Sequence, residues 1–159
     1  MGPTDDPASL ERFVLAQRRS HDTALAELRR GRKQSHWMWY VFPQLRSLGR
    51  SDMSWHYGIA DLEEARAYLA HPALGPRLAE AAAAVLAHAG TPAAAILGPV
   101  DANKLRSSMT LFSAVPGAPA VFGQVLERFF DGRRCPRTLE RIGRSGEARE
   151  APTSPGPRP

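Results

Sequence analysis

The sequence predicts an all-α protein, a compact single-domain bundle of six to seven helices with short connections. Apolar residues recur at helical spacing along most of the chain, and no segment shows the sustained alternation of a half-buried strand. Helix caps, glycines and prolines divide the chain at short intervals. A length of 159 residues is typical of a single domain. We expect the domain to span residues 8–143, and residues 144–159, which are rich in Gly, Pro, Ser and Arg, to form a disordered tail.

A long helix, a short helix and a loop are expected in the first third of the chain. Apolar residues at helical spacing predict the long helix over residues 9–30, either continuous or broken near Ser20, and Gly31 fits its C-terminal end. Ser35 is expected to cap the short helix. Pro43 limits that helix to about two turns, because it disfavours helical geometry in the preceding residue. The ten residues after Pro43 are expected to form a loop.

The rest of the chain carries several local signals for helix starts and ends. Asp61 and Glu64 have capping-box spacing, and Pro72 closes or bends the helix that follows. Thr91-Pro92 predicts the start of another helix with proline at its first position. Asp101 is expected to cap a helix. In order after Pro72, helices are expected over residues 73–89, 92–98, 102–115, 119–130 and 137–142.

Composition limits the class of protein and favours phosphate-bearing partners. The net charge is +5, and eight basic and two acidic residues between Arg18 and Arg50 give that stretch a charge of +6. A solvated helix face would explain the same excess. The lone Cys135 cannot form an internal disulfide, which suggests the cytoplasm. We expect no membrane span, no cofactor and no metal site, since the histidines are scattered. The oligomeric state is left open, and a monomer is compatible with the sequence.

The segment from Ser35 to Gln44 concentrates aromatic rings and polar groups that would suit a flat, phosphate-bearing ligand. His36 is the candidate general acid–base group, and on a helix it would share a face with Tyr40, four residues later. The candidate ligand-binding residues of this segment are Ser35, Trp37, Trp39, Tyr40 and Gln44. The alternative is an aromatic piece of the core with a silent His36.

A second candidate segment runs from Asp101 to Phe112. Lys104 falls on one helical face with Ser107 and Ser108, near a helix N-terminus, as in phosphate-binding surfaces. Lys104 is the second candidate catalytic residue. The candidate ligand-binding residues here are Arg106, Ser107, Ser108 and Thr110. The alternative is close helix packing at the serine pair. Cys135 lies among arginines that would lower its pKa, although a single thiol near a tail is thin evidence for a nucleophile.

These two segments carry a resemblance to a known family. Residues 35–45 and 104–112 resemble the two signature stretches of the bacterial DUF1810 family, and the similarity extends from about Leu10 to Gly143. Shorter matches are Arg12-Phe13 with Gln17, residues 65–69 with His71-Pro72, and Leu74-Gly75 with Leu78. The resemblance implies a small all-α protein of about six helices and no particular function. Some members are labelled calpastatin, but calpain inhibition would call for an extended, disordered inhibitor and not a folded bundle.

Together the two segments predict a pocket for a nucleotide-like ligand such as ADP-ribose, an NAD-derived molecule or a nucleic-acid end. An aromatic ring would stack on a base, and Lys104 with Ser107 and Ser108 would hold phosphate or ribose. The protein would bind this ligand or hydrolyse it, so whether it is an enzyme is left open. Two alternatives remain. One is a non-enzymatic helical interaction module whose buried polar residues fix helix register. The other is a non-specific nucleic-acid binder.

Overall fold

The structure, a computed structural model, describes residues 8–150, and the side chains of residues 8–143. This part of the chain contains nine α-helices and one 3-10 helix, so the all-α prediction is confirmed. Six of the helices have at least nine residues, and α2, α3 and α6 have four or five. In order they are α1 (Glu11–Arg30), α2 (Met38–Val41), η1 (Arg46–Leu48), α3 (Asp52–His56), α4 (Leu62–Ala70), α5 (Leu74–Leu86), α6 (Ala93–Leu97), α7 (Pro99–Ser113), α8 (Ala120–Phe130) and α9 (Pro136–Glu150).

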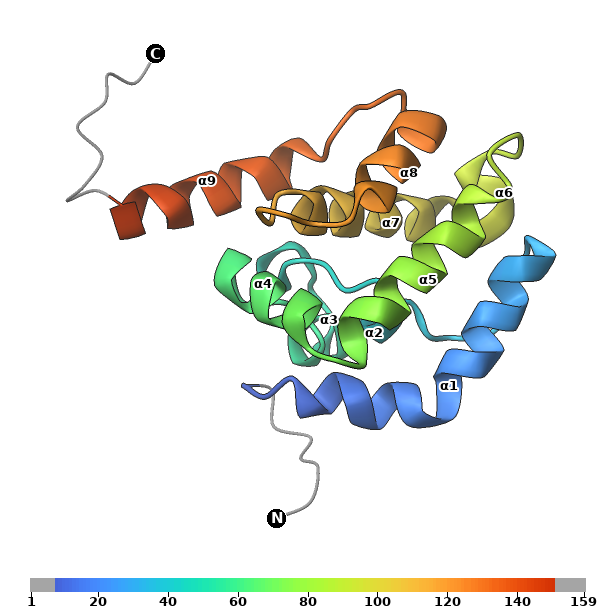
Figure 1. Cartoon of the computed structure of the whole chain (residues 1–159), viewed down its shortest axis with the longest axis horizontal. Coiled ribbons are helices and arrows are strands. Elements are labelled where there is room, and N and C mark those ends of the chain that lie inside the picture. The colour runs from blue at the N-terminus through green and yellow to red at the C-terminus, as the bar shows by residue number, and fades with distance from the viewer. Residues whose placement is uncertain (1–7, 151–159) are drawn as a thin grey trace.

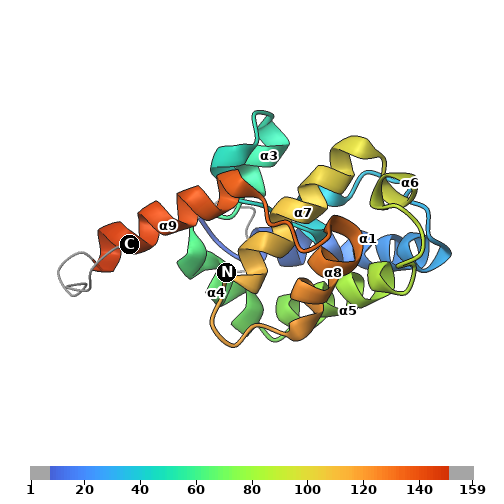
Figure 2. The ribbon, with the colours of Figure 1, turned by 90° about the horizontal axis from the view of Figure 1, so that it is seen from above.

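Helices α5 and α7 form the centre of the bundle (Figure 1). Helix α5 packs against α1, α4 and α8, while α7 packs against α4, α6, α8 and α9. Helix α2 packs against α1, and the view from above shows α3 projecting from the same side of α7 as the start of α9 (Figure 2). In both views α9 points away from the body of the bundle, so its start is the part that contributes to the surface around α7.

A line of aromatic rings connects four helices through the core. Phe13 of α1 meets Tyr68 of α4 edge-on at 5.1 Å between ring centroids, and Tyr68 lies 5.2 Å from Phe112 of α7. Phe112 in turn lies 6.1 Å from Phe122 of α8. All four side chains are fully buried. Rings of this size supply most of the apolar area that a small core buries, and their tilted contacts fix the helices relative to one another.

Several local signals act as the sequence predicts. Helix α1 is continuous, and Gly31 ends it in the left-handed conformation with φ of 80°. Asp61 caps α4, since its Oδ1 accepts a hydrogen bond from the Glu64 amide at 2.9 Å. Glu64 does not complete the capping box on Asp61, because its carboxylate accepts from the Ala60 amide at 2.8 Å and pairs with Arg12.

Three local predictions are wrong. Ser35 does not cap α2, which begins at Met38 without a side-chain cap. Asp101 does not cap α7, because Pro99 is already helical after Gly98, and Asp101 lies in the first turn. The predicted loop after Pro43 holds η1 and α3, with Ser51 as the cap accepting from the Ser54 amide at 3.0 Å. Ser35 instead binds Glu27 of α1. The other two helices start from neighbouring signals, Gly98-Pro99 for α7 and Ser51 for α3.

The segment from Gln44 to Ile59 closes on itself. The Arg46 amide donates to the Ile59 carbonyl and the Ile59 amide donates to the Gln44 carbonyl, both at 2.8 Å. Gly58 makes this closure possible, because a Cβ there would lie 2.3 Å from the Arg46 Cα. The closed segment therefore presents α3 as a fixed unit on the surface beside α7.

The C-terminal helix is longer than the sequence indicates. A final turn is expected over residues 137–142, whereas α9 spans Pro136–Glu150. The domain boundary at 143 stays a prediction, and residues 151–159 of the expected tail lie outside the described residues. Across the described helices, none has the length and apolar character needed to cross a membrane.

Candidate functional site

A groove of about 420 Å³ lies between the closed segment, α7 and the start of α9; we call it the α7 groove. Its lining residues are Gln44, Leu48, Gly49, Arg50, Ser51, Ser54, Val100, Asn103, Lys104, Ser107, Cys135 and Arg137. A smaller hollow adjoins it and shares Gln44, Ser54 and Lys104 with it, adding Trp39 of α2. The groove thus brings Gln44 of the first candidate segment to Lys104 and Ser107 of the second, and the adjoining hollow adds Trp39.

The lining of the α7 groove is positively charged. It includes Arg50, Lys104 and Arg137, and none of the described residues that line it is acidic. Asp101 lies beside Lys104 at 3.8 Å, but its other oxygen is closer to Lys33, at 3.1 Å. Clustered cations in a concave surface attract anions. The amides and hydroxyls among the lining residues add hydrogen-bonding groups, so the surface suits a phosphate or carboxylate.

Lys104 is placed against an aromatic ring. Its Nζ lies 5.6 Å from the ring centroid of Trp39, a half-buried residue of α2. This cation–π contact keeps the ammonium at the mouth of the smaller hollow. The ring therefore helps to hold the charge in the groove, a role that differs from the stacking platform suggested by the sequence.

His36 is not brought to Lys104 in this groove. It is exposed, precedes the first turn of α2 and is not among the lining residues. The predicted common helical face with Tyr40 does not form, because α2 starts two residues after His36. Its backbone carbonyl accepts a hydrogen bond from the Tyr40 hydroxyl at 3.3 Å. The geometry gives no support to a general acid–base role for His36.

Ser35 and Trp37 belong to a buried cluster around Glu27. The Glu27 carboxylate accepts from the Gln34 amide at 2.7 Å, the Ser35 hydroxyl at 2.5 Å and the Trp37 indole at 2.9 Å. Burial alone would raise the pKa of Glu27, but these bonds and one from the Ser35 amide lower it to about 2. Ser35 and Trp37 therefore join the end of α1 to α2 and do not line the groove.

Tyr40 is also held by partners within the fold. Its hydroxyl donates to Ser20 at 3.0 Å. The amide nitrogen of buried Gln17 donates to the Tyr40 carbonyl at 2.7 Å and to the Tyr68 hydroxyl at 3.0 Å. Burial raises the pKa of Tyr68 well above its ordinary value, which is consistent with a phenol that stays neutral in the core.

Two of the remaining candidates on α7, Arg106 and Thr110, support the connection between α8 and α9. Arg106 donates to the carbonyls of Arg133 at 2.7 Å and Arg134 at 2.9 Å. Thr110 accepts from the Cys135 amide at 2.9 Å. Ser108 is fully buried, and its hydroxyl has no hydrogen-bond partner among the described residues. Arg106 and Thr110 thus hold the segment that leads to Cys135 and α9 against α7.

Cys135 lies at the start of α9 and lines the groove. Burial acts to raise the pKa of its thiol, but hydrogen bonds from Ser107 and from Thr138 and Arg137 at the helix start lower it overall. The Ser107 hydroxyl is 3.4 Å from Sγ. The flanking arginines that the sequence singles out are therefore less important for the pKa of Cys135 than the helix terminus.

Other residues that line the α7 groove, such as Arg50, Asn103 and Arg137, are exposed polar residues that no sequence pattern singled out.

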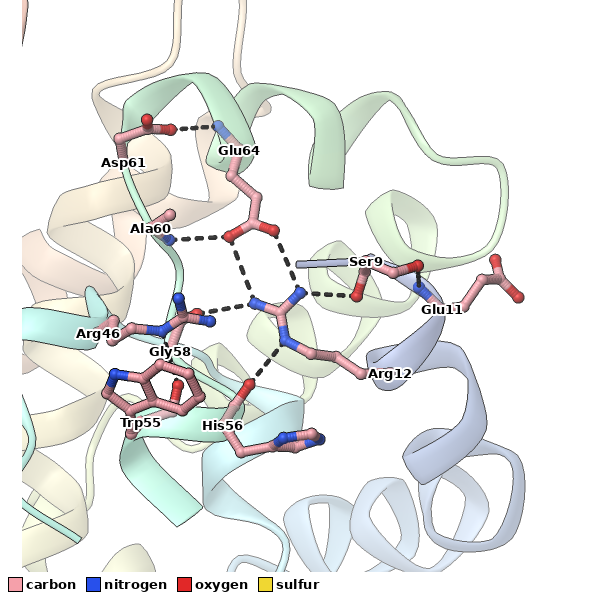
Figure 3. A network of polar contacts seen from close by, with 10 residues as sticks. All are labelled: Ser9, Glu11, Arg12, Arg46, Trp55, His56, Gly58, Ala60, Asp61 and Glu64. Carbon is pink, nitrogen blue, oxygen red and sulfur yellow. Dashed lines mark hydrogen bonds and ion pairs between the residues drawn. The ribbon is translucent and has the colours of Figure 1, made fainter. Parts of the chain in front are cut away.

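A buried arginine, Arg12, fixes the closed segment, which forms one side of the α7 groove (Figure 3). Arg12 donates to the carbonyls of His56 at 2.7 Å and Gly58 at 2.8 Å, and its guanidinium pairs with Glu64 at 3.2 Å. Arg12 is fully buried although it is charged. A buried charge of this kind is tolerated only with several partners, and here those partners join the end of α3 to α1 and α4.

Within the described residues no cluster of three or more His, Cys, Asp or Glu could hold a metal ion.

Comparison with known proteins agrees with the sequence resemblance. The family described as "Protein of unknown function (DUF1810)" matches residues 7–142. The chain is similar to the crystal structure of the conserved hypothetical protein Rv1873 from Mycobacterium tuberculosis, with 46% sequence identity and a TM-score of 0.84. The match covers 87% of this chain and 99% of that one. No curated protein matches the sequence.

Proposed function

This chain belongs to the DUF1810 family of proteins of unknown function, and we propose that it binds a nucleotide-like, phosphate-bearing ligand in the α7 groove. The observation that carries the proposal is the set of three cations, Arg50, Lys104 and Arg137, in one groove without an acidic lining residue. The groove volume of about 420 Å³ lies within the range of small-molecule pockets. Charge and size together favour a small anion over an apolar ligand.

The groups around the groove suit separate parts of such a ligand. Lys104 and Arg137 would bind phosphate oxygens through charge-assisted hydrogen bonds. The amides of Gln44 and Asn103 and the hydroxyl of Ser107 would bind ribose or the edge of a base. Hydrolysis is not part of the proposal, because His36, the candidate acid–base group, lies outside the groove.

Titration with ADP-ribose, NAD and AMP, followed by calorimetry, tests the proposal. Lys104→Ala should weaken the tightest of these ligands about tenfold or more, because a hydrogen bond to a charged group contributes about 1.5–3 kcal/mol. Arg19→Ala, which removes an exposed cation of α1, is the matched control and should leave the affinity unchanged. Absence of binding by all three ligands, or equal affinity in the wild type and Lys104→Ala, would contradict the proposal.

One observation favours a second candidate, a non-enzymatic helical interaction module. Much of the first signature segment serves the fold, since Ser35 and Trp37 bind Glu27 and Tyr40 binds Ser20. The two candidates differ in what Lys104 does. If Lys104 serves a scaffold, Lys104→Ala lowers the free energy of unfolding measured in urea. If it serves the groove, that free energy is nearly unchanged and only ligand affinity falls.

A further inference from the structure

Helix α3, which contributes Ser54 to the α7 groove, also carries an exposed aromatic ring. Trp55 is 54% exposed and its neighbour Met53 is 39% exposed, although tryptophan is usually well buried. The preceding residue, Ser54, lines the groove. Since the Cα atoms of successive residues are about 3.8 Å apart, the backbone of Trp55 lies close to the groove.

The ring of Trp55 is held in one orientation. The Arg46 guanidinium lies over it, with Cζ 4.4 Å from the ring centroid (Figure 3). The Arg46 Nε also donates to the Trp55 carbonyl at 2.7 Å, which ties the stacked side chain to the backbone of α3. A surface ring fixed in this way loses little conformational freedom when a ligand stacks on it.

Four arginines lie in the closed segment that carries Trp55 or beside it. Arg46 and Arg50 belong to the segment, where Arg46 stacks on the ring and Arg50 lines the groove. Arg137 also lines the groove, and Arg141 donates to the Ser47 carbonyl at 3.0 Å. Positive charge is therefore found beyond the groove lining, at η1 and over the face of the Trp55 ring.

We propose that the ligand of the α7 groove is the end of a single-stranded nucleic acid whose next base stacks on Trp55. This inference rests on the proposed function, because the terminal nucleotide would occupy the groove. Stacked aromatic and guanidinium planes beside a positive groove are how proteins bind single strands. An acidic peptide would use the same charges but would gain little from the ring, so the exposed indole favours nucleic acid.

The test compares a mononucleotide with an oligonucleotide on the same protein. The probes are thymidine monophosphate and a short, fluorescently labelled oligodeoxythymidine with a 5′-phosphate. The wild type should bind the oligonucleotide more tightly than the monophosphate. Trp55→Ala should weaken oligonucleotide binding about tenfold, as the loss of one base–aromatic stack does, and leave monophosphate affinity unchanged. Trp55→Phe should keep most of the affinity, and Met53→Ala is the control for an exposed apolar residue of the same helix.

The outcomes separate this inference from the proposed function. Equal oligonucleotide affinity in the wild type and Trp55→Ala overturns the inference, as does equally strong competition by a polyglutamate peptide. If the monophosphate binds and depends on Lys104 while Trp55→Ala has no effect, the groove proposal stands alone. If neither probe binds, this inference fails, and the titration with ADP-ribose, NAD and AMP alone decides the groove proposal. A drop in oligonucleotide affinity with rising salt is expected from the arginines, and its absence would also overturn the inference.

Discussion

Replacing Glu27 with glutamine tests how far the buried cluster around its carboxylate supports the fold. Glu27 is 3% exposed and accepts hydrogen bonds from Gln34, Ser35 and Trp37. The substitution keeps the volume of the side chain but removes the charge. The amide oxygen can still accept from the Trp37 indole and from the Gln34 and Ser35 amides, but these bonds lose their charge assistance, and an NH₂ group replaces the oxygen that accepts from the Ser35 hydroxyl.

The size of the effect follows from the pKa. The pKa of Glu27 is about 2 in the folded protein, against 4.5 for an ordinary glutamate side chain. At about 1.4 kcal/mol for each pKa unit, the ionised carboxylate stabilises the fold by about 3 kcal/mol. Because the folded pKa is the lower one, this stability is fully present above pH 4.5 and is lost as pH falls towards 2. Glu27→Gln should therefore lower the free energy of unfolding at neutral pH by a similar amount.

Urea denaturation between pH 3 and pH 7 measures both consequences. The wild type should lose stability over the acidic part of this range, and Glu27→Gln should show a smaller loss there because its carboxylate is gone. Asp22→Asn, at an exposed position of the same helix, is the matched control and should change little. A Glu27→Gln variant as stable as the wild type at pH 7, with the same dependence on pH, would refute the reasoning.

Two further substitutions test contacts between distant segments. Arg12→Ala should lower the free energy of unfolding in urea by about 3–5 kcal/mol, because it removes the cation paired with Glu64 and the donor to three carbonyls. An Arg12→Lys variant as stable as the wild type would contradict the role of the guanidinium fork. Gly75→Ala should cost about 1–3 kcal/mol and lower Tm, because its Cβ would lie 2.2 Å from the Leu69 carbonyl oxygen. Gly90→Ala, where a Cβ meets nothing within 4 Å, is the control and should melt like the wild type.

Much of the helical architecture follows from local sequence. The spacing of apolar residues in α1, the αL glycine at residue 31 and the cap at Asp61 act within one or two turns, so each is visible without the fold. Helix α3 was not predicted, because its cap at Ser51 is followed by few apolar residues. Its stability comes from Arg12, which lies more than forty residues away in the chain.

The candidate site was predicted in part. Both signature segments reach the α7 groove, through Gln44 on one side and Lys104 and Ser107 on the other, and Trp39 lines the adjoining hollow. Other residues of the same segments, such as Ser35 and Thr110, support the fold instead. A polar residue in a sequence has the same hydrogen-bonding groups in either role. Which role it takes depends on the partner it finds.

An all-α fold, the positions of the long helices before α9 and the two segments that carry unusual polar residues all follow from the sequence. These properties depend on periodicity and on caps that act over a few residues. Only the tertiary structure decided that Glu27 binds Ser35 and Trp37, that His36 stays outside the groove and that Cys135 enters it. These outcomes depend on side chains brought together by helix packing, and no local pattern encodes which distant group will be within hydrogen-bonding distance.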